Sequence, residues 1–230
     1  MTGSDVPNPK DLLLDAALMH VPFDGWSEAT WEAVLAETDV NPVVATALCP
    51  RGAVDLAVAY HQRGDAVMLD RLAAADLAEM RFRDRIAAAV RFRLEAVEDK
   101  ELVRRGMTLF SLPNHAGEGA RLVWGTVDQI WTALGDSSDD VNWYTKRATL
   151  SGVYSATLLY WLGDDSEDHV ASWEFLDRRI ENVMQFEKLK ADVRGNKFLS
   201  GVLKGPMAVL DRIKAPAAAR GDLPGSLNNR

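Results

Sequence analysis

Residues 10–50 read KDLLLDAALMHVPFDGWSEATWEAVLAETDVNPVVATALCP, and this stretch predicts three short helices in succession. Its apolar residues recur every three or four positions, which is the period of a helix with one buried face. The first helix is expected to run from about Lys10 to Val21 and to stop near Pro22 and Gly25, and Ser27 is a good N-cap for the second. Asn41 followed by Pro42 is typical of the start of a third. Two short helices, a tight break and a third short helix make a helix-turn-helix pattern.

The third of these helices lacks the side chains of a DNA reader. In a DNA-binding helix-turn-helix, this helix contacts base edges, and binding to the phosphates needs several cations. The segment from Asn41 to Leu48 contains no Lys or Arg, and Arg51 comes only after it. We therefore expect a degenerate helix-turn-helix over residues 10–50 and no nucleic-acid partner.

The rest of the chain is also expected to be helical, so the predicted fold class is all-α. The sequence is rich in Ala, Leu, Arg and Glu, and it shows no sustained alternation of apolar and polar residues. Residues 1–9 are expected to be flexible, and residues 215–230, with their Pro, Gly and Asn, to be disordered. Further helices are expected at residues 52–72, 75–97, 100–110, 117–134, 139–162 and 167–189.

Composition narrows the functional classes. The 230 residues carry a formal net charge of −8, which argues against wholesale nucleic-acid binding. A single cysteine, Cys49, excludes an intramolecular disulfide and a multi-cysteine metal site. The four histidines, His61 among them, are scattered without metal-site spacing, and no phosphate-binding glycine loop is present in the sequence. We therefore expect no metal, no cofactor and no catalytic residues, and we do not expect an enzyme.

Large aromatic side chains crowd the second half of the chain. They accompany apolar stripes with helical spacing, such as Val123, Val127 and Ile130. Such stripes fit an ordinary packed core, and they also fit a helical bundle that encloses a cavity for an apolar ligand. The pattern does not separate the two. For the second interpretation, the candidate lipid-binding residues are Val123, Trp124, Val127, Trp131, Tyr154, Leu158, Trp161, Trp173 and Leu176.

Residues 139–148, DDVNWYTKRA, combine two aromatic residues with two cations. On a helix, the consecutive residues Asn142, Trp143 and Tyr144 span about 200° and do not all face the core. An aromatic side chain near the surface beside Arg147 has the composition of a binding hot spot. The alternative is a helix start whose aromatic rings pack on a neighbouring loop.

The segment 196–214 predicts an amphipathic helix that lies on a membrane. Residues 188–230 hold nine basic and three acidic residues, whereas residues 1–187 hold 17 and 31, so the positive charge gathers near this helix. The alternative is a helix that folds back on the body of the protein or on a dimer partner. The candidate membrane-binding residues are Phe198, Leu199, Val202, Leu203, Val209, Leu210 and Ile213 on the apolar arc, with Lys197 and Lys204 on the opposite side.

Several motifs resemble those of the coenzyme Q biosynthesis "protein nine" family, and the resemblance extends over residues 12–213. The most specific is G-D-x-S-x-D-x-N-W-Y-T-K-R-A at residues 135–148. Weaker matches are Leu112-Pro113, V-D-x-x-W at 127–131, V-Y-x-x-T at 153–157 and W-x-F-L-x-x-R-I at 173–180.

The resemblance implies an all-α, TetR-regulator-like bundle that forms a homodimer. Residues 51–190 would be the lipid-binding and dimerisation domain, and its ligand an isoprenoid, a quinone lipid or a phospholipid. The implied role is non-catalytic: the protein would present quinone intermediates to the demethoxyubiquinone hydroxylase or to another ubiquinone-biosynthesis enzyme. The family's partner-binding residues fall on Asp128, Ile130, Trp143, Tyr144 and Arg147, and its last helix is a membrane anchor.

Residues 1–10 have neither the apolar core of a signal peptide nor the arginines of a transit peptide. We therefore expect a bacterial, cytoplasmic protein that associates peripherally with the inner membrane. One alternative function is that of a TetR-family transcriptional regulator with a hydrophobic ligand pocket. Another is that of a small hydrolase or isomerase acting on the bound lipid, for which the sequence identifies no catalytic pair.

Overall fold

The computed structural model describes the backbone of residues 8–195 and the side chains of residues 8–185. Over this range the chain is helical and has no strand, so the expected all-α fold is confirmed. The elements are α1 (Pro9–Asp24), α2 (Glu28–Glu37), α3 (Pro42–Leu48), α4 (Ala53–Ala74), α5 (Phe82–Glu95), α6 (Lys100–Ser111), α7 (Ala116–Ala133), α8 (Val141–Leu162), the 3-10 helix η1 (Glu167–His169) and α9 (Val170–Gly195).

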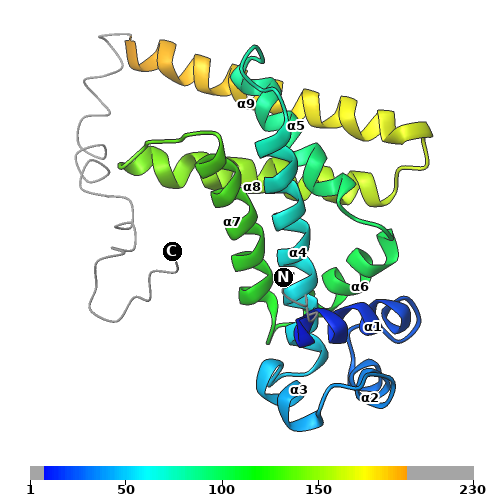
Figure 1. Cartoon of the computed structure of the whole chain (residues 1–230). Coiled ribbons are helices and arrows are strands. Elements are labelled where there is room, and N and C mark those ends of the chain that lie inside the picture. Colours follow the sequence, from blue (N-terminus) through cyan, green and yellow to red (C-terminus); the bar gives the residue numbers. More distant parts are fainter. Residues whose placement is uncertain (1–7, 196–230) are drawn as a thin grey trace, which may run out of the picture.

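Helix α4 runs through the middle of the molecule, and α1, α2, α5 and α7 pack against it (Figure 1). Helices α1, α2 and α3 gather around its first turns, and α5 and α7 pack along it. Helix α6 contacts α1 and α7, while α8 and α9 lie antiparallel to each other across the half of the molecule away from α1–α3 (Figure 1).

The helix-turn-helix segment is built from the expected caps, with one correction. The Ser27 hydroxyl accepts a hydrogen bond from the backbone N–H of Thr30 (3.4 Å), and the Asn41 side chain accepts one from Val43 (2.9 Å). The first helix, however, does not end before Pro22 but continues through it to Asp24. A proline in a last turn removes only one hydrogen bond, and the helix ends instead where Gly25 takes a positive φ of +71°.

Two buried clusters make up the core, and α4 contributes to both. Its first half packs Leu56 against α1 and α2, and its second half packs Met68 against α5 and α7–α9. Both side chains are completely buried. Helix α4 therefore holds the helix-turn-helix end and the bundle end in a fixed relation.

Two expected helices begin later than the sequence pattern predicts. Residues 75–81 are not helical, because the Asp76 side chain accepts a hydrogen bond from the backbone of Ala78 (3.2 Å) and so competes with the helix. Arg85 then holds this linker through the carbonyls of Met80 and Ala78 (both 2.9 Å). The α-helix expected over 167–189 begins only at Val170, after the 3-10 helix η1 at Glu167–His169, since Asp168 and His169 take positive φ angles of 50° and 55°.

Some expectations concern residues outside the described range. The amphipathic helix at 196–214, its nine candidate membrane-binding residues, the tail at 215–230 and most of the segment 1–9 lie there. Among the described residues, no single helix is long and apolar enough to cross a bilayer. The pair α3 and α4, bent by 61°, meets the same length and composition test only together.

Candidate ligand cavity and partner surface

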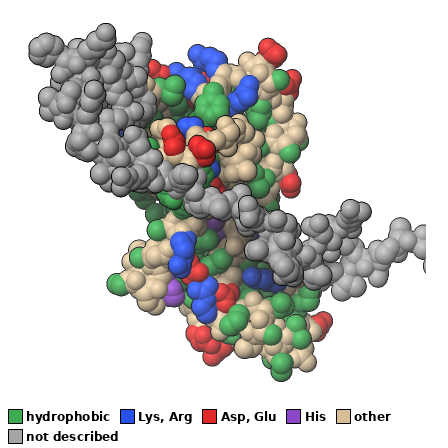
Figure 2. Space-filling model, turned by 90° about the vertical axis from the view of Figure 1, so that its left-hand side faces the viewer, with side chains coloured by type: hydrophobic (Ala, Val, Ile, Leu, Met, Phe, Trp, Pro, Cys, Tyr) green, Lys and Arg blue, Asp and Glu red, His purple; other side chains and the backbone are tan. Residues whose placement is uncertain are grey.

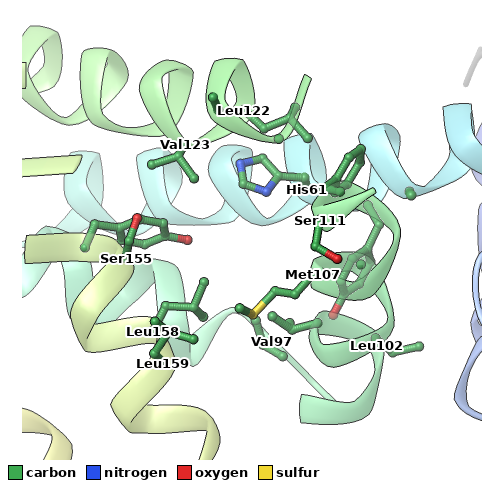
Figure 3. Close-up of a pocket in the computed structure, with 18 of the residues that line it drawn as sticks. His61, Val97, Leu102, Met107, Ser111, Leu122, Val123, Ser155, Leu158 and Leu159 are labelled. Atoms are coloured by element: carbon green, nitrogen blue, oxygen red, sulfur yellow. The ribbon is translucent and has the colours of Figure 1, made fainter. Parts of the chain in front are cut away.

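A cavity of about 310 Å³ lies between α4, α5, α6, α7 and α8 (Figure 3). This volume is at the lower end of the roughly 300–1,000 Å³ range of small-molecule sites. Leu159, on α8, lines the cavity and is 59% exposed, so the cavity opens to solvent beside it, and we call this opening the mouth. Ser111, Ala116 and Ala120 of the lining are exposed as well, on α6 and α7. The apolar lining includes Trp26, Leu94, Val103, Met107, Phe110, Val123, Leu158 and Leu159.

Polar side chains also line the cavity, and we call three of them, His61, Arg93 and Tyr154, its polar corner. Arg93 Nε donates to Asp65 Oδ1 (2.6 Å), and both side chains are almost fully buried. The Thr126 hydroxyl also donates to Asp65 Oδ1 (2.9 Å) and lies 2.8 Å from His61 Nε2. The corner therefore joins α4, α5 and α7 through one buried carboxylate.

In the polar corner, His61 and Tyr154 are uncharged, and the only charges are those of the ion pair between Arg93 and Asp65. Desolvation and the nearby Arg93 guanidinium lower the pKa of His61 to about 4, so the imidazole is neutral at physiological pH. Burial raises the pKa of Tyr154, so this phenol keeps its proton. The cavity thus offers neutral hydrogen-bonding groups, and the charge of Arg93 is matched by Asp65.

The candidate lipid-binding residues divide among different places. Val123, Tyr154 and Leu158 line the cavity. Trp131 lines a second cavity of about 230 Å³ between α5, α7, α8 and α9, where Lys146 lies 5.3 Å from the centre of its ring.

The other five candidate lipid-binding residues touch neither cavity. Val127, Trp161 and Leu176 are buried in the bundle core, so their stripes are ordinary packing. Trp124 packs beside Trp143, and the Trp173 indole donates to a backbone carbonyl in η1 (2.8 Å).

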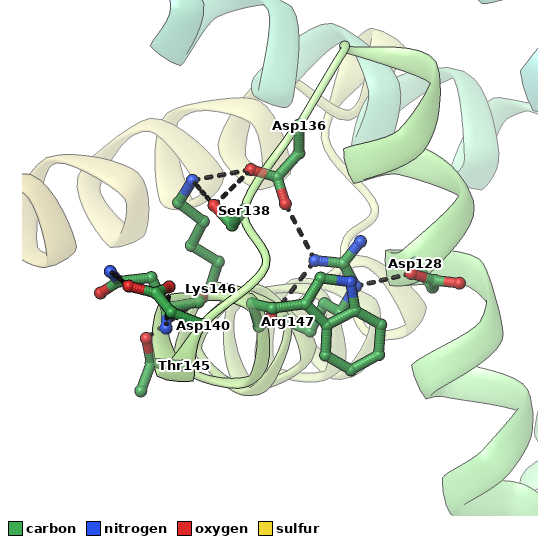
Figure 4. A network of polar contacts seen from close by, with 9 residues as sticks. Asp128, Asp136, Ser138, Asp140, Thr145, Lys146 and Arg147 are labelled. Carbon is green, nitrogen blue, oxygen red and sulfur yellow. Dashed lines mark hydrogen bonds and ion pairs between the residues drawn. The ribbon is translucent and has the colours of Figure 1, made fainter. Parts of the chain in front are cut away.

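Arg147 is the centre of a second polar network, at the start of α8 (Figure 4). Its side chain is 2% exposed. Its Nε donates to Asp128 Oδ1 (2.6 Å), and its Nη1 donates to Asp136 Oδ2 (3.0 Å) and to the carbonyl of Trp143 (3.2 Å). Lys146 donates to the other oxygen of Asp136 (2.7 Å). The network therefore ties α7, the α7–α8 loop and α8 together.

Trp143 and Tyr144 form a half-buried aromatic pair on this network. The two rings meet edge to face, with centroids 4.8 Å apart. The Arg147 guanidinium lies 4.0 Å from the centre of the Trp143 ring, and Trp124 packs on it from α7 with centroids 5.9 Å apart. Arg147 thus supports Trp143 from the interior.

The remaining partner candidates differ in exposure. Asp128 is 42% exposed, so its carboxylate reaches solvent. Ile130 is completely buried in the bundle core, and in this chain it does not reach the surface. The aromatic pair and Asp128 are therefore the exposed part of the expected surface.

Sequence reasoning missed two members of the polar corner, His61 and Arg93, whereas Tyr154 was among the candidate lipid-binding residues. His61 was read as a lone histidine, although Asp65 follows it by four residues and so lies on the same helix face. Arg93 comes from another helix, and no spacing in the sequence connects it to either residue. Within the described residues, no group of three or more His, Cys, Asp or Glu side chains could hold a metal ion. Cys49 is buried, which raises the pKa of its thiol.

Replacing Asp136 with Asn is expected to destabilise the protein. Burial alone would favour the protonated acid, but hydrogen bonds from Lys146, Arg147 and Ser138 outweigh it and lower the Asp136 pKa to about 2. The substitution should cost about 2–3 kcal/mol of unfolding free energy, less than the roughly 3–5 kcal/mol typical of a broken buried pair, because Asp128 still neutralises Arg147.

The effect of Asp136→Asn should also depend on pH. A carboxyl with a lowered folded-state pKa stabilises the protein above its ordinary pKa, so the difference should be constant above about pH 4 and shrink toward pH 2. Urea unfolding of both proteins across this range measures it. A difference that does not change with pH would contradict the assignment.

Part of the chain matches a known protein family, and most of it matches curated members of that family. Residues 116–187 match the family model described as COQ9. The chain is 33% identical over 190 residues to "Ubiquinone biosynthesis protein COQ9, mitochondrial" of Drosophila melanogaster, a match that covers 80% of this chain and 57% of that protein. It is 26% identical over 190 residues to the probable coq9 protein of Dictyostelium discoideum, covering 79% and 61%. The chain thus spans about 60% of the length of these curated relatives.

A solved structure shares the fold. The crystal structure of a TetR transcriptional regulator from Nitrosomonas europaea superposes with a TM-score of 0.61 at 20% sequence identity, covering 75% of this chain and 95% of that one. The expected TetR-like fold is therefore confirmed. The resemblance of this chain to the coenzyme Q biosynthesis protein nine family is likewise confirmed, because residues 116–187 match the COQ9 family model and the Drosophila COQ9 protein is similar over 190 residues. Its fold is shared with a TetR regulator.

Proposed function

We propose that this protein is a non-catalytic lipid-binding accessory protein of ubiquinone biosynthesis. It binds isoprenoid quinone intermediates at the membrane and presents them to a ring-modifying hydroxylase. The observation that carries the proposal is the apolar cavity of about 310 Å³ between α4 and α8, in a chain whose curated relatives are named ubiquinone biosynthesis proteins.

The physical basis is the insolubility of the intermediates. Burying an isoprenoid tail gains roughly 0.8 kcal/mol for each CH₂ group removed from water. The cavity is apolar and has the exposed Leu159 at its mouth, so an isoprenoid tail can leave the bilayer and be buried in the protein instead. A soluble or peripheral enzyme then meets a ligand that it could not easily reach in the membrane.

Leu158→Trp is expected to fill the cavity and remove most of the lipid that copurifies with the protein. Native mass spectrometry of the purified protein, followed by lipid extraction, measures this occupancy. Leu12→Trp, on the surface of α1, is the matched control and should keep the ligand. An unchanged occupancy in Leu158→Trp, or no lipid in the unmodified protein, would contradict the proposal.

The partner surface in this proposal consists of Trp143, Tyr144 and Asp128. A tryptophan held rigidly by a buried arginine loses little entropy on binding, which is typical of hot spots. The resemblance suggests the di-iron demethoxyubiquinone hydroxylase as the partner, and a homodimer as the form that binds it.

Trp143→Lys should abolish pull-down of that hydroxylase, because a lysine ammonium would have to be desolvated at the contact. Val43→Lys adds the same charge on the exposed face of α3 and should leave the pull-down intact. Circular dichroism checks that both variants fold. If the hydroxylase still binds the folded Trp143→Lys variant, the surface is wrongly assigned.

Peripheral attachment to the inner membrane belongs to the same proposal, and it rests on the basic, amphipathic sequence of residues 196–214. Deleting this segment should abolish co-sedimentation with vesicles that contain phosphatidylglycerol. Deleting residues 215–230 instead is the control and should leave binding largely unchanged. Equal sedimentation of both deletion proteins would overturn the membrane role of 196–214.

The shared fold and cavity also fit a ligand-responsive transcriptional regulator. The surface of α3 argues against it. Arg51 is held by Asp55 (2.6 Å) and Glu118 (2.8 Å), and Val43 and Val44 are exposed on α3 where a DNA reader carries polar side chains. On the face in Figure 2, Lys and Arg side chains lie among acidic and hydrophobic ones rather than in a continuous patch. A salt-dependent shift of operator DNA in a gel would favour the regulator.

A further inference from the structure

The polar corner of the cavity contains two hydrogen-bonding groups that the fold does not use. The first is the Tyr154 hydroxyl. Tyr154 is 2% exposed and lines the cavity, and its hydroxyl has no hydrogen-bond partner among the described residues. It differs from Tyr60, which lines the same cavity but has its hydroxyl sealed in the interior without a partner.

The second group is Nδ1 of His61, whose protonation follows from its neighbours. The Thr126 hydroxyl has one proton, and a carboxylate is a stronger acceptor than an imidazole, so this proton goes to Asp65. The 2.8 Å contact between His61 Nε2 and Thr126 Oγ1 is then a hydrogen bond that Nε2–H donates. Because the ring is neutral, Nδ1 is a bare acceptor, and the ring itself faces the cavity (Figure 3).

The two groups line the same cavity, one from α4 and one from α8. His61 and Tyr154 both experience the charges of Arg93 and Asp65. A donor and an acceptor in the wall of an apolar cavity fit a group that both accepts and donates a hydrogen bond. A hydroxyl can accept from Tyr154 through its oxygen and donate its own proton to His61.

We propose that His61 and Tyr154 recognise the hydroxyl of a phenolic head group, whose apolar tail lies along Leu158 toward the mouth at Leu159. This inference rests on the proposed lipid-binding function and adds which head group is selected and which way the ligand points. A phenol fits better than an anionic head group, because Asp65 already neutralises Arg93 and an unpaired anion would be costly to desolvate here. The small volume also favours one ring with the first part of one tail.

The test compares two probes, 2-geranylphenol and geranylbenzene, which share the tail and the ring and differ only in the hydroxyl. Binding to the full chain is followed by tryptophan fluorescence, since Trp26 lines the cavity. The unmodified protein should bind geranylphenol about tenfold more tightly, the effect of one satisfied pair of buried hydrogen bonds. Tyr154→Phe should weaken geranylphenol about five- to tenfold and leave geranylbenzene unchanged.

Tyr160→Phe is the matched control, because it removes a tyrosine hydroxyl from the same helix, α8, at a position that lines neither cavity. It should leave both affinities as they are. Near-ultraviolet circular dichroism compares the folds of the two variants, and the comparison of probes in the unmodified protein requires no variant at all.

Two results separate the possible failures. If the unmodified protein binds both probes equally and Tyr154→Phe has no effect, head-group recognition is overturned while lipid binding stands. If neither probe binds the unmodified protein, the proposed lipid-binding function fails and this inference fails with it.

Discussion

The buried ion pair between Asp65 and Arg93 is the constraint on which the bundle and its cavity both depend. It joins α4 to α5, and through Thr126 it reaches α7. Removing either partner would leave a charge in the interior, which typically costs about 3–5 kcal/mol. Gly64 reflects the same constraint, since a Cβ at this position would lie 2.6 Å from an Arg93 nitrogen. The pair therefore sets how closely α4 and α5 approach, and so where the cavity has polar groups.

Helix α8 connects the two sites that the proposed function needs. Trp143 lies in its first turn on the Arg147 network, and Leu159 lies near its other end at the cavity mouth. Sixteen residues separate them, which is about 24 Å at 1.5 Å per residue. An enzyme docked on the aromatic pair must therefore extend along α8 to receive a ligand from the mouth. If the head group enters first, the ligand must also leave the cavity before its ring can react.

The sequence predicted helix starts well where a side chain caps the helix. It predicted them poorly where a side chain binds the backbone in place of a helical hydrogen bond. The Ser27 and Asn41 caps and the absence of cations from α3 could be read directly. The helix expected from residue 75 was wrong over 75–81, because the Asp76 side chain competes for the backbone there. The motif at 135–148 located the Arg147 network, since three of its charged residues bond to one another. The cavity was only partly predictable, and three of the nine candidate lining residues reach it.

The sequence by itself determined the all-helical class, the order of three short helices with no Lys or Arg in the third, and the resemblance to the coenzyme Q biosynthesis family. These are properties of short segments, and they can be read from the spacing of apolar residues, from helix-capping residues and from short motifs. Only the tertiary structure decided which aromatic residues fill a core and which line a cavity, and that His61 and Tyr154 line the same cavity. Helical periodicity says which face of a helix is buried, but not against which helix, and not whether the space between them is filled.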